Sequence, residues 1–134
     1  AQFLKYRTYH GCALPPPTQA ASIVAWQDEL HVRENRDQYR DKFAAVLNIL
    51  RPHIDLHAPD ASFYLWMPTP IDDSVFAKNL FAQQNITVLP GSFLSRDAHG
   101  SNPGASHVRI ALVAPVEECI EAAQRIKHFL QHSI

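Results

Sequence analysis

Hydrophobic positions between residues 30 and 50 recur at steps of three and four, which is the spacing of one face of an α-helix. Charged residues fall mainly between them, and Pro52 follows the last apolar position. The pattern predicts a long amphipathic helix, longer than a small domain needs, that could connect to another domain. Its apolar residues are Tyr39, Phe43, Val46, Leu47 and Leu50.

Three other stretches also have the composition of helices. Thr18 stands at an N-cap position before a run of good helix formers. Asp72 and Asp73 place negative charge where the start of a helix favours it. The last stretch near the end of the chain has apolar residues on one face. The predicted helices cover residues 18–28, 73–84 and 116–131.

Short runs rich in β-branched and aromatic residues predict strands between these helices. They cover residues 54–57, 63–66, 86–89 and 107–113. We expect the first two to pair as a hairpin, residues 95–106 to form a loop, and residues 1–17 to be extended or irregular. The order of elements predicts an α+β fold, a two-layer sandwich in which a small, largely antiparallel sheet is covered by helices, with a long N-terminal connecting helix. The expected division is 1–28, the tail of a large domain or a linker, and 29–134, a small domain.

Length and charge exclude several classes of protein. The chain has 134 residues, which suits one domain, and 12 basic against 13 acidic residues give a net charge of -1. Such a chain has no electrostatic footprint for nucleic acid, and its apolar runs are too short to cross a membrane. Two cysteines and no signal peptide favour a cytoplasmic protein. The chain does not begin with Met, so we expect it to be a fragment.

Few residues carry a pattern typical of chemistry. The cluster at His10 and Cys12 matches no zinc-binding spacing, and no nucleophile elbow or phosphate-binding loop occurs, so we expect no metal site. Arg109 is the exception, because it lies within an otherwise apolar strand that follows a long loop. It could be a solvated strand residue, or it could bind a carboxylate through two parallel hydrogen bonds.

Five runs, in this order and spacing, resemble the C-terminal third of the class I/II aminotransferases, which are pyridoxal-phosphate enzymes of fold type I. The greatest likeness is to the bacterial succinyldiaminopimelate transaminases of lysine and diaminopimelate biosynthesis. The resemblance extends over essentially the whole chain and implies a C-terminal small domain. The runs are Tyr6–Ala13, Pro17–Ser22, Phe63–Trp66, Val88–Ser95 and Val108–Leu112.

The resemblance implies roles in substrate binding for four residues. The family's strand arginine, which binds the α-carboxylate of the substrate, corresponds to Arg109. Pro90 and Gly91 correspond to a loop at the mouth of the active site. Arg7 resembles the arginine that binds a distal carboxylate across a dimer interface, although a surface arginine beside Lys5 would look the same in the sequence.

The resemblance also implies what this chain does not contain. The family's catalytic lysine and its residues for the cofactor ring and phosphate belong to a large domain, upstream of the part that this chain resembles. The chain's lysines, Lys5, Lys42, Lys78 and Lys127, lie outside the Schiff-base motif, and we expect Lys42 and Lys127 on helix surfaces. We therefore expect no catalytic residue here, pyridoxal phosphate in the full-length parent, and no cofactor bound covalently to this chain.

The implied function is that of part of an aminotransferase that recognises substrate carboxylates and closes over the active site. The expected partners are the missing large domain, a second copy in a homodimer, and a small amino-acid or keto-acid substrate. The residues alone also allow two other functions without catalysis. One is a stand-alone module that binds small molecules, and the other is a module that associates with itself through exposed apolar side chains.

Overall fold

The structure is a computed structural model that describes residues 2–11 and 14–133, so Cys12 lies outside the described residues. The chain divides into two compact units, residues 1–36 and 37–134. The boundary falls within one helix, α3 (Leu30–Leu50). The expected division at residues 28 and 29 stays a prediction.

The first unit contains α1 (Gln2–His10) and α2 (Pro16–Gln27), and neither helix has a buried residue. The expectation of an irregular segment over residues 1–17 is therefore wrong for most of its length. The prediction that Thr18 caps the helix is also wrong, because Pro15 precedes the first turn. A proline fits the first turn of a helix, where its missing N–H has no intrahelical partner to lose.

The second unit contains a three-stranded antiparallel sheet in the order β1-β3-β2. Its strands are β1 (Tyr64–Pro68), β2 (Leu89–Pro90) and β3 (His107–Ala111), with β3 in the centre. α4 (Asp73–Gln84), the short 3-10 helix η1 (Gly91–Phe93) and α5 (Val116–His132) complete the unit. The predicted α+β fold, a small antiparallel sheet covered by helices, is confirmed.

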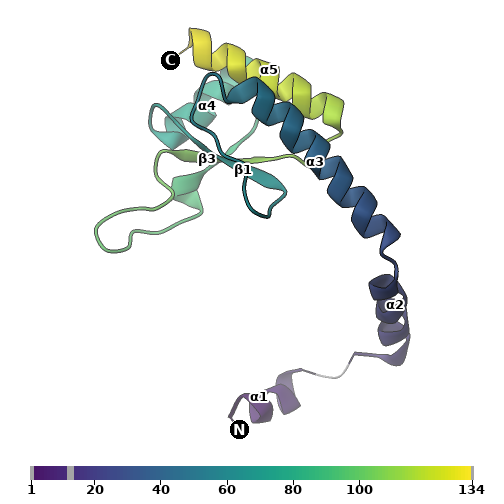
Figure 1. Cartoon of the computed structure of the whole chain (residues 1–134). Helices are drawn as coiled ribbons and strands as arrows, with labels where there is room; N and C mark the ends of the chain where they lie inside the picture. Colours follow the sequence, from purple (N-terminus) through teal and green to yellow (C-terminus); the bar gives the residue numbers. More distant parts are fainter. Residues whose placement is uncertain (1, 12–13, 134) are drawn as a thin grey trace. The chain divides into compact units, whose positions relative to one another are not determined.

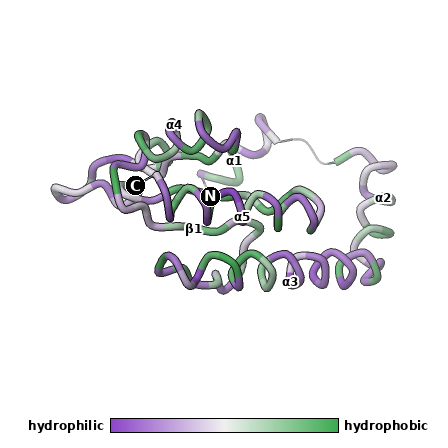
Figure 2. The backbone as a smooth tube through the Cα atoms, turned by 90° about the horizontal axis from the view of Figure 1, so that it is seen from above, coloured by the Kyte–Doolittle hydropathy of each residue, from purple (hydrophilic) through white to green (hydrophobic). Residues whose placement is uncertain are grey.

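One face of the sheet is buried against helices. Side chains alternate along β1 and β3, so that Leu65, Met67 and Val108 lie in the core with residues of α3, α4 and α5. Phe76 of α4 and Phe129 of α5 meet edge to face, with ring centroids 5.2 Å apart. Figures 1 and 2 show α3 and α5 side by side in this helical layer.

The sequence of α4 sets both of its ends. Asp72 caps the first turn, because its carboxylate accepts hydrogen bonds from the backbone N–H of Ser74 and Val75. Asn85 ends the helix in the left-handed conformation, with a φ of 53°, which asparagine adopts more readily than most residues. The helix predicted over 73–84 is therefore confirmed at both ends.

Two predicted strands differ from the structure. Residues 54–57 form no strand, and β1 pairs with β3 instead, so the predicted hairpin is wrong. The backbone there is bound locally, since Ile54 N donates to Leu50 O and the Arg51 side chain donates to Leu56 O. The strand expected over 86–89 is confirmed only at Leu89.

Lys42 is not on the helix surface, as expected from the sequence, but buried, with only 7% of its area exposed. Its ammonium lies 4.8 Å from the centre of the Tyr39 ring, a cation–π contact that offsets part of the loss of water. No helix in the described part of the chain has both the length and the apolar character needed to cross a membrane.

Candidate functional site

The face of the sheet opposite the core carries polar and aromatic side chains. Trp66 of β1 and Leu89 of β2 both pair with Arg109, one on each side of the central strand. Because neighbours in register share a face of the sheet, these three side chains lie together. Tyr64 and His107 are two positions away along their strands and belong to the same face.

The guanidinium of Arg109 is available to a ligand. It lies 5.5 Å from the centre of the Tyr64 ring, which supports it from one side. Among residues 2–11 and 14–133, no carboxylate lies within 4 Å of it. A half-buried arginine on a central strand is held more rigidly than one on a loop, so its planar group can offer two parallel donors to a carboxylate. It lines an open groove with Pro59, Ala61, Ser62, Tyr64, Trp66 and Leu94.

Trp66 forms a wall of this groove and is 37% exposed. Its indole stacks on the ring of His107, with centroids 5.6 Å apart and an angle of 10° between the planes. The His107 ring is itself fixed, because Nδ1 lies 2.9 Å from Ala105 O. A Cβ added to Gly91 would come within 2.8 Å of the indole, so the loop at Gly91 packs directly against this wall.

The long loop after η1 is fastened to its own start. A Cβ on Gly91 would lie 2.2 Å from Gly104 O, and a Cβ on Gly104 would lie 2.1 Å from Gly91 O, so only glycines allow the two backbones to approach. Gly104 N donates to Ser95 Oγ at 3.1 Å and to Asn102 Oδ1 at 2.9 Å. Ser95 Oγ also lies 3.0 Å from Gly91 O. The result is a closed clasp at the base of the loop.

A second attachment joins this loop to α4. Asp73 is buried, with 2% of its area exposed, and its Oδ2 accepts a hydrogen bond from Ser92 N at 2.8 Å. Burial raises the pKa of Asp73, but hydrogen bonds from the Ser92 hydroxyl and amide outweigh it and hold the pKa below its usual value. The carboxylate is therefore charged at neutral pH, and its bond to Ser92 is strengthened by that charge.

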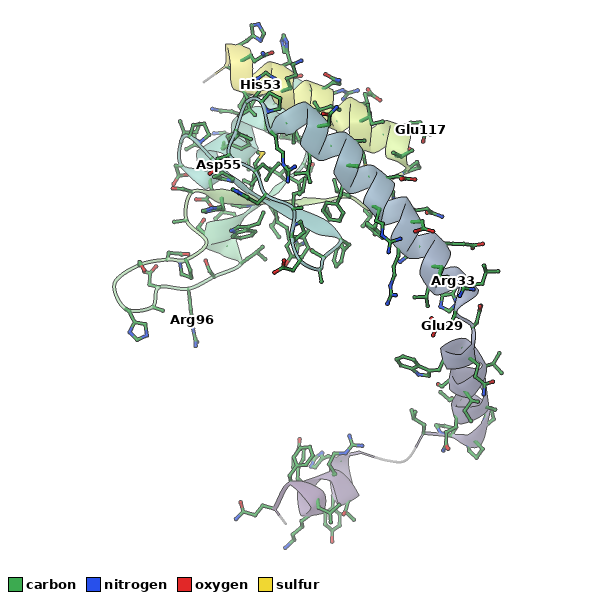
Figure 3. All side chains as sticks on the ribbon, in the orientation of Figure 1. Glu29, Arg33, His53, Asp55, Arg96 and Glu117 are labelled. Atoms are coloured by element: carbon green, nitrogen blue, oxygen red, sulfur yellow. The ribbon has the colours of Figure 1, made fainter. Side chains whose placement is uncertain are left out.

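The structure brings together some of the residues that the sequence singled out. Pro90 pairs with Val108 beside Arg109, and Gly91 follows it and packs against Trp66, which lines the groove. Arg7 is exposed in α1, which belongs to the other unit, so its role stays a prediction. Arg96 is another arginine close in sequence to the loop, but it projects outward from it in Figure 3.

Sequence reasoning did not single out Trp66 and Asp73 as site residues. A signal for Trp66 was available, because Tyr64 and Trp66 are two positions apart in one strand and must share a face. No such signal existed for Asp73. The helix start explains both carboxylates in the sequence, and only the structure shows that Asp72 is the cap while Asp73 reaches Ser92.

The residues of the groove fit a carboxylate, because the Arg109 guanidinium lines it. A Schiff base requires a lysine amine, and none of the described residues that line this groove is a lysine. Lys42 lines a different hollow, with Gln38, Asp41 and Val113. The chemistry that these residues can perform is therefore recognition and orientation of an anionic group.

The comparisons with known proteins agree on one family. The model of the family "aminotransferase class I and II" matches residues 3–126. A probable aminotransferase of Mycobacterium tuberculosis is 36% identical over 129 residues, which is 94% of this chain and 29% of that protein. The LL-diaminopimelate aminotransferase of Aquifex aeolicus is 31% identical over 114 residues, which is 82% of this chain and 28% of that protein.

Solved structures show the same likeness. An aminotransferase from Neisseria meningitidis is 52% identical, with a TM-score of 0.90 over 96% of this chain and 33% of that one. A probable N-succinyldiaminopimelate aminotransferase from Thermus thermophilus is 33% identical, with a TM-score of 0.62 over 76% of this chain and 26% of that one. The chain thus spans a third or less of the length of each of these proteins.

Proposed function

Because this chain belongs to the class I and II aminotransferase family, we propose that it supplies the substrate-carboxylate site of a pyridoxal-phosphate-dependent aminotransferase. In such an enzyme the cofactor, when bound, carries the amino group from an amino acid to a keto acid. This chain's share is to bind and orient the substrate. The lysine and the cofactor contacts belong to a large domain, which is the first proposed partner.

The observation that carries this proposal is the position and surroundings of the Arg109 side chain. It is held on the central strand, supported by Tyr64, and without a carboxylate partner among the described residues. A guanidinium in that position can hold an α-carboxylate by two hydrogen bonds and so fix the direction of the bonds at the substrate's Cα. Trp66 and Leu94, as walls of the groove, limit where the rest of the substrate can lie.

For the substrate, we propose an amino-group transfer from glutamate to a keto acid of the diaminopimelate type, such as N-succinyl-2-amino-6-ketopimelate. Two of the similar proteins carry names of this class, one for LL-diaminopimelate and one for its N-succinyl derivative. Both glutamate and the succinylated substrate have a second carboxylate. Arg7 is our candidate for binding it, and a homodimer is the assembly in which we expect it to do so.

Substitution of Arg109 by lysine in the longer enzyme that contains this chain tests the proposal. Lysine keeps the charge but loses the two-point contact, so kcat/KM should fall by roughly 10- to 100-fold. The loss should be similar with glutamate and with alanine as amino donors, because both have an α-carboxylate. Arg96→Lys, on the outward-facing loop, is the matched control and should leave both values unchanged.

Two other results would change the proposal. If Arg109→Lys leaves kcat/KM unchanged for both donors, Arg109 is a solvated strand residue and the carboxylate site is elsewhere. Arg7→Lys should weaken only donors and acceptors that have a distal carboxylate. Equal losses with alanine and glutamate would remove Arg7 from that role.

A further inference from the structure

The segment that begins at Gly91 is held by the clasp, by a bond from Thr69 N to Ser106 O at its far end, and by a bond to α4. The clasp joins Gly91 to Gly104 and closes the loop on itself. It does not fix the loop to the helical layer of the unit. The bond from Ser92 N to Asp73 Oδ2 does so, and it joins residues 19 positions apart in the chain.

Asp73 is not the residue that caps α4. Asp72 already caps the helix, with its Oδ1 3.0 Å from Ser74 N and 3.1 Å from Val75 N. A second acidic residue in the first turn could remain in solvent and still favour the helix dipole. Asp73 is instead 2% exposed, and burial of a carboxylate is costly unless specific hydrogen bonds compensate for it.

Asp73 is connected to the groove of Arg109 through a short series of contacts. Asp73 holds Ser92, and the neighbouring Gly91 packs on the indole of Trp66 and the carbonyl of His107. Trp66 in turn pairs with Arg109 across β1 and β3 and lines the same groove. A shift of the Gly91–Ser92 segment would therefore remove packing from the Trp66 indole, whereas the backbones of Trp66 and Arg109 stay paired in the sheet.

We propose that Asp73 is a positioning residue for the substrate groove. Asp73 holds the Gly91–Ser92 segment, and this segment in turn holds the Trp66 indole beside Arg109. This inference rests on the proposed carboxylate-binding function and adds a residue to that site. It assigns Asp73 no contact with substrate. Since the wall would touch bound substrate before and during the reaction alike, its loss should weaken binding more than it slows the chemical step.

The first measurement is independent of enzymatic activity. In the 134-residue chain, amide hydrogen exchange at Ser92 should be roughly 10- to 100-fold faster in Asp73→Ala than in the unsubstituted chain, because a buried, charge-assisted bond is lost. Asp73→Asn keeps an acceptor oxygen and should give an intermediate rate. Asp72→Ala removes the neighbouring carboxylate and should leave Ser92 exchange unchanged.

The second measurement is steady-state kinetics of the longer enzyme that contains this chain. We expect Asp73→Ala to raise KM for the amino donor about tenfold with a smaller change in kcat. Asp73→Asn should recover part of that loss. Asp72→Ala should change neither constant once the folded fraction is matched, which separates positioning of the groove from general stability of α4.

The outcomes distinguish this inference from the proposed function. Slow exchange at Ser92 in Asp73→Ala would overturn the bond itself. Fast exchange with unchanged KM, or equal effects of Asp72→Ala and Asp73→Ala, would show that Asp73 only stabilises the fold. If Arg109→Lys is without effect while Asp73→Ala still raises KM, the carboxylate site is wrong but the loop remains part of the groove.

Discussion

α2 and α5 are both well-formed helices, yet they have opposite relations to a core. α5 buries Cys119, Ala123, Ile126 and Phe129 on one face. α2 carries apolar side chains as well, but none is buried, and Trp26 is 84% exposed. The comparison shows that a sequence with good helix formers is enough for a helix, whereas a stable packed unit needs apolar positions that meet a facing layer. The apolar residues of α2 have no core to pack against within the first unit.

The largest expected effect tests this difference directly. Phe76→Ala should destabilise the second unit by about 3–5 kcal/mol, because Phe76 is fully buried against Phe129 and its removal leaves a cavity. Trp26→Ala removes a side chain that is larger but exposed, and at concentrations where the chain is monomeric it should change the free energy of unfolding by less than about 0.5 kcal/mol. Urea unfolding followed by circular dichroism measures both.

Comparable losses for the two variants would mean that Trp26 is covered in solution, either by a second copy or by the rest of the chain. That possibility leads to the next prediction, which concerns the apolar side chains of α2. They include Ile23, Val24 and Trp26, all exposed.

We expect the 134-residue chain to associate with itself through the first unit. Burial of one large apolar side chain contributes about 1.5–3 kcal/mol, so the double substitution Ile23→Ser and Trp26→Ser should weaken association at least tenfold. Sedimentation velocity over a range of concentrations measures it. A control double substitution at exposed polar positions, Gln19→Ser and Gln27→Ser, should leave association unchanged. A chain that stays monomeric at high micromolar concentration would contradict this prediction.

The contrast between packed and exposed helices also explains which parts of the fold could be predicted from the sequence. The helices over 30–50 and 73–84 were predictable, because periodicity and end signals such as Asn85 agree there. The segment over 54–57 was not, since its local bonds to Leu50 and Arg51 take the place of strand pairing and cannot be seen in the sequence. α1 was not predicted, because its apolar residues do not gather on one face of the helix and none of its residues is buried.

Prediction of the candidate site shows a similar limit. Arg109 could be singled out because a charge in an apolar strand is unusual, and its place in a known family pattern gave it a role. The wall of Trp66 and the clasp at Gly104 depend on which strands pair and how closely two backbones approach. Those contacts are long-range and are not encoded in the spacing of residues along one segment.

The smallest expected effect concerns the two neighbouring carboxylates at the start of α4. Asp72 is exposed and Asp73 is buried, just as the side chains of α2 are exposed and those on one face of α5 are buried. Asp72 is exposed, and the Ser74 side chain and the amide of Val75 lower its pKa. Asp73 is buried, which raises its pKa, but the bonds from Ser92 reverse that effect, and its pKa is also lowered. Both groups therefore favour the charged form more in the folded chain than in the unfolded one.

A carboxyl group whose pKa is lower in the folded state stabilises the fold fully at a pH above its unfolded value, which is 3.8 for these residues. That contribution is lost as the pH falls through the lower, folded value. The melting temperature of the second unit should therefore be nearly constant from about pH 7 to 5 and should fall below about pH 4.

Asp73→Asn cannot titrate, so it should melt at a lower temperature near pH 7 but lose less on acidification, and its curve should converge with that of the unsubstituted chain at low pH. Asp72→Asn should show the same convergence from a smaller initial difference, because its carboxylate is screened by water. Calorimetry from pH 7 to 2.5 measures all three curves. Parallel curves for Asp73→Asn and the unsubstituted chain would mean that Asp73 binds protons equally in both states, which the buried bond to Ser92 does not allow.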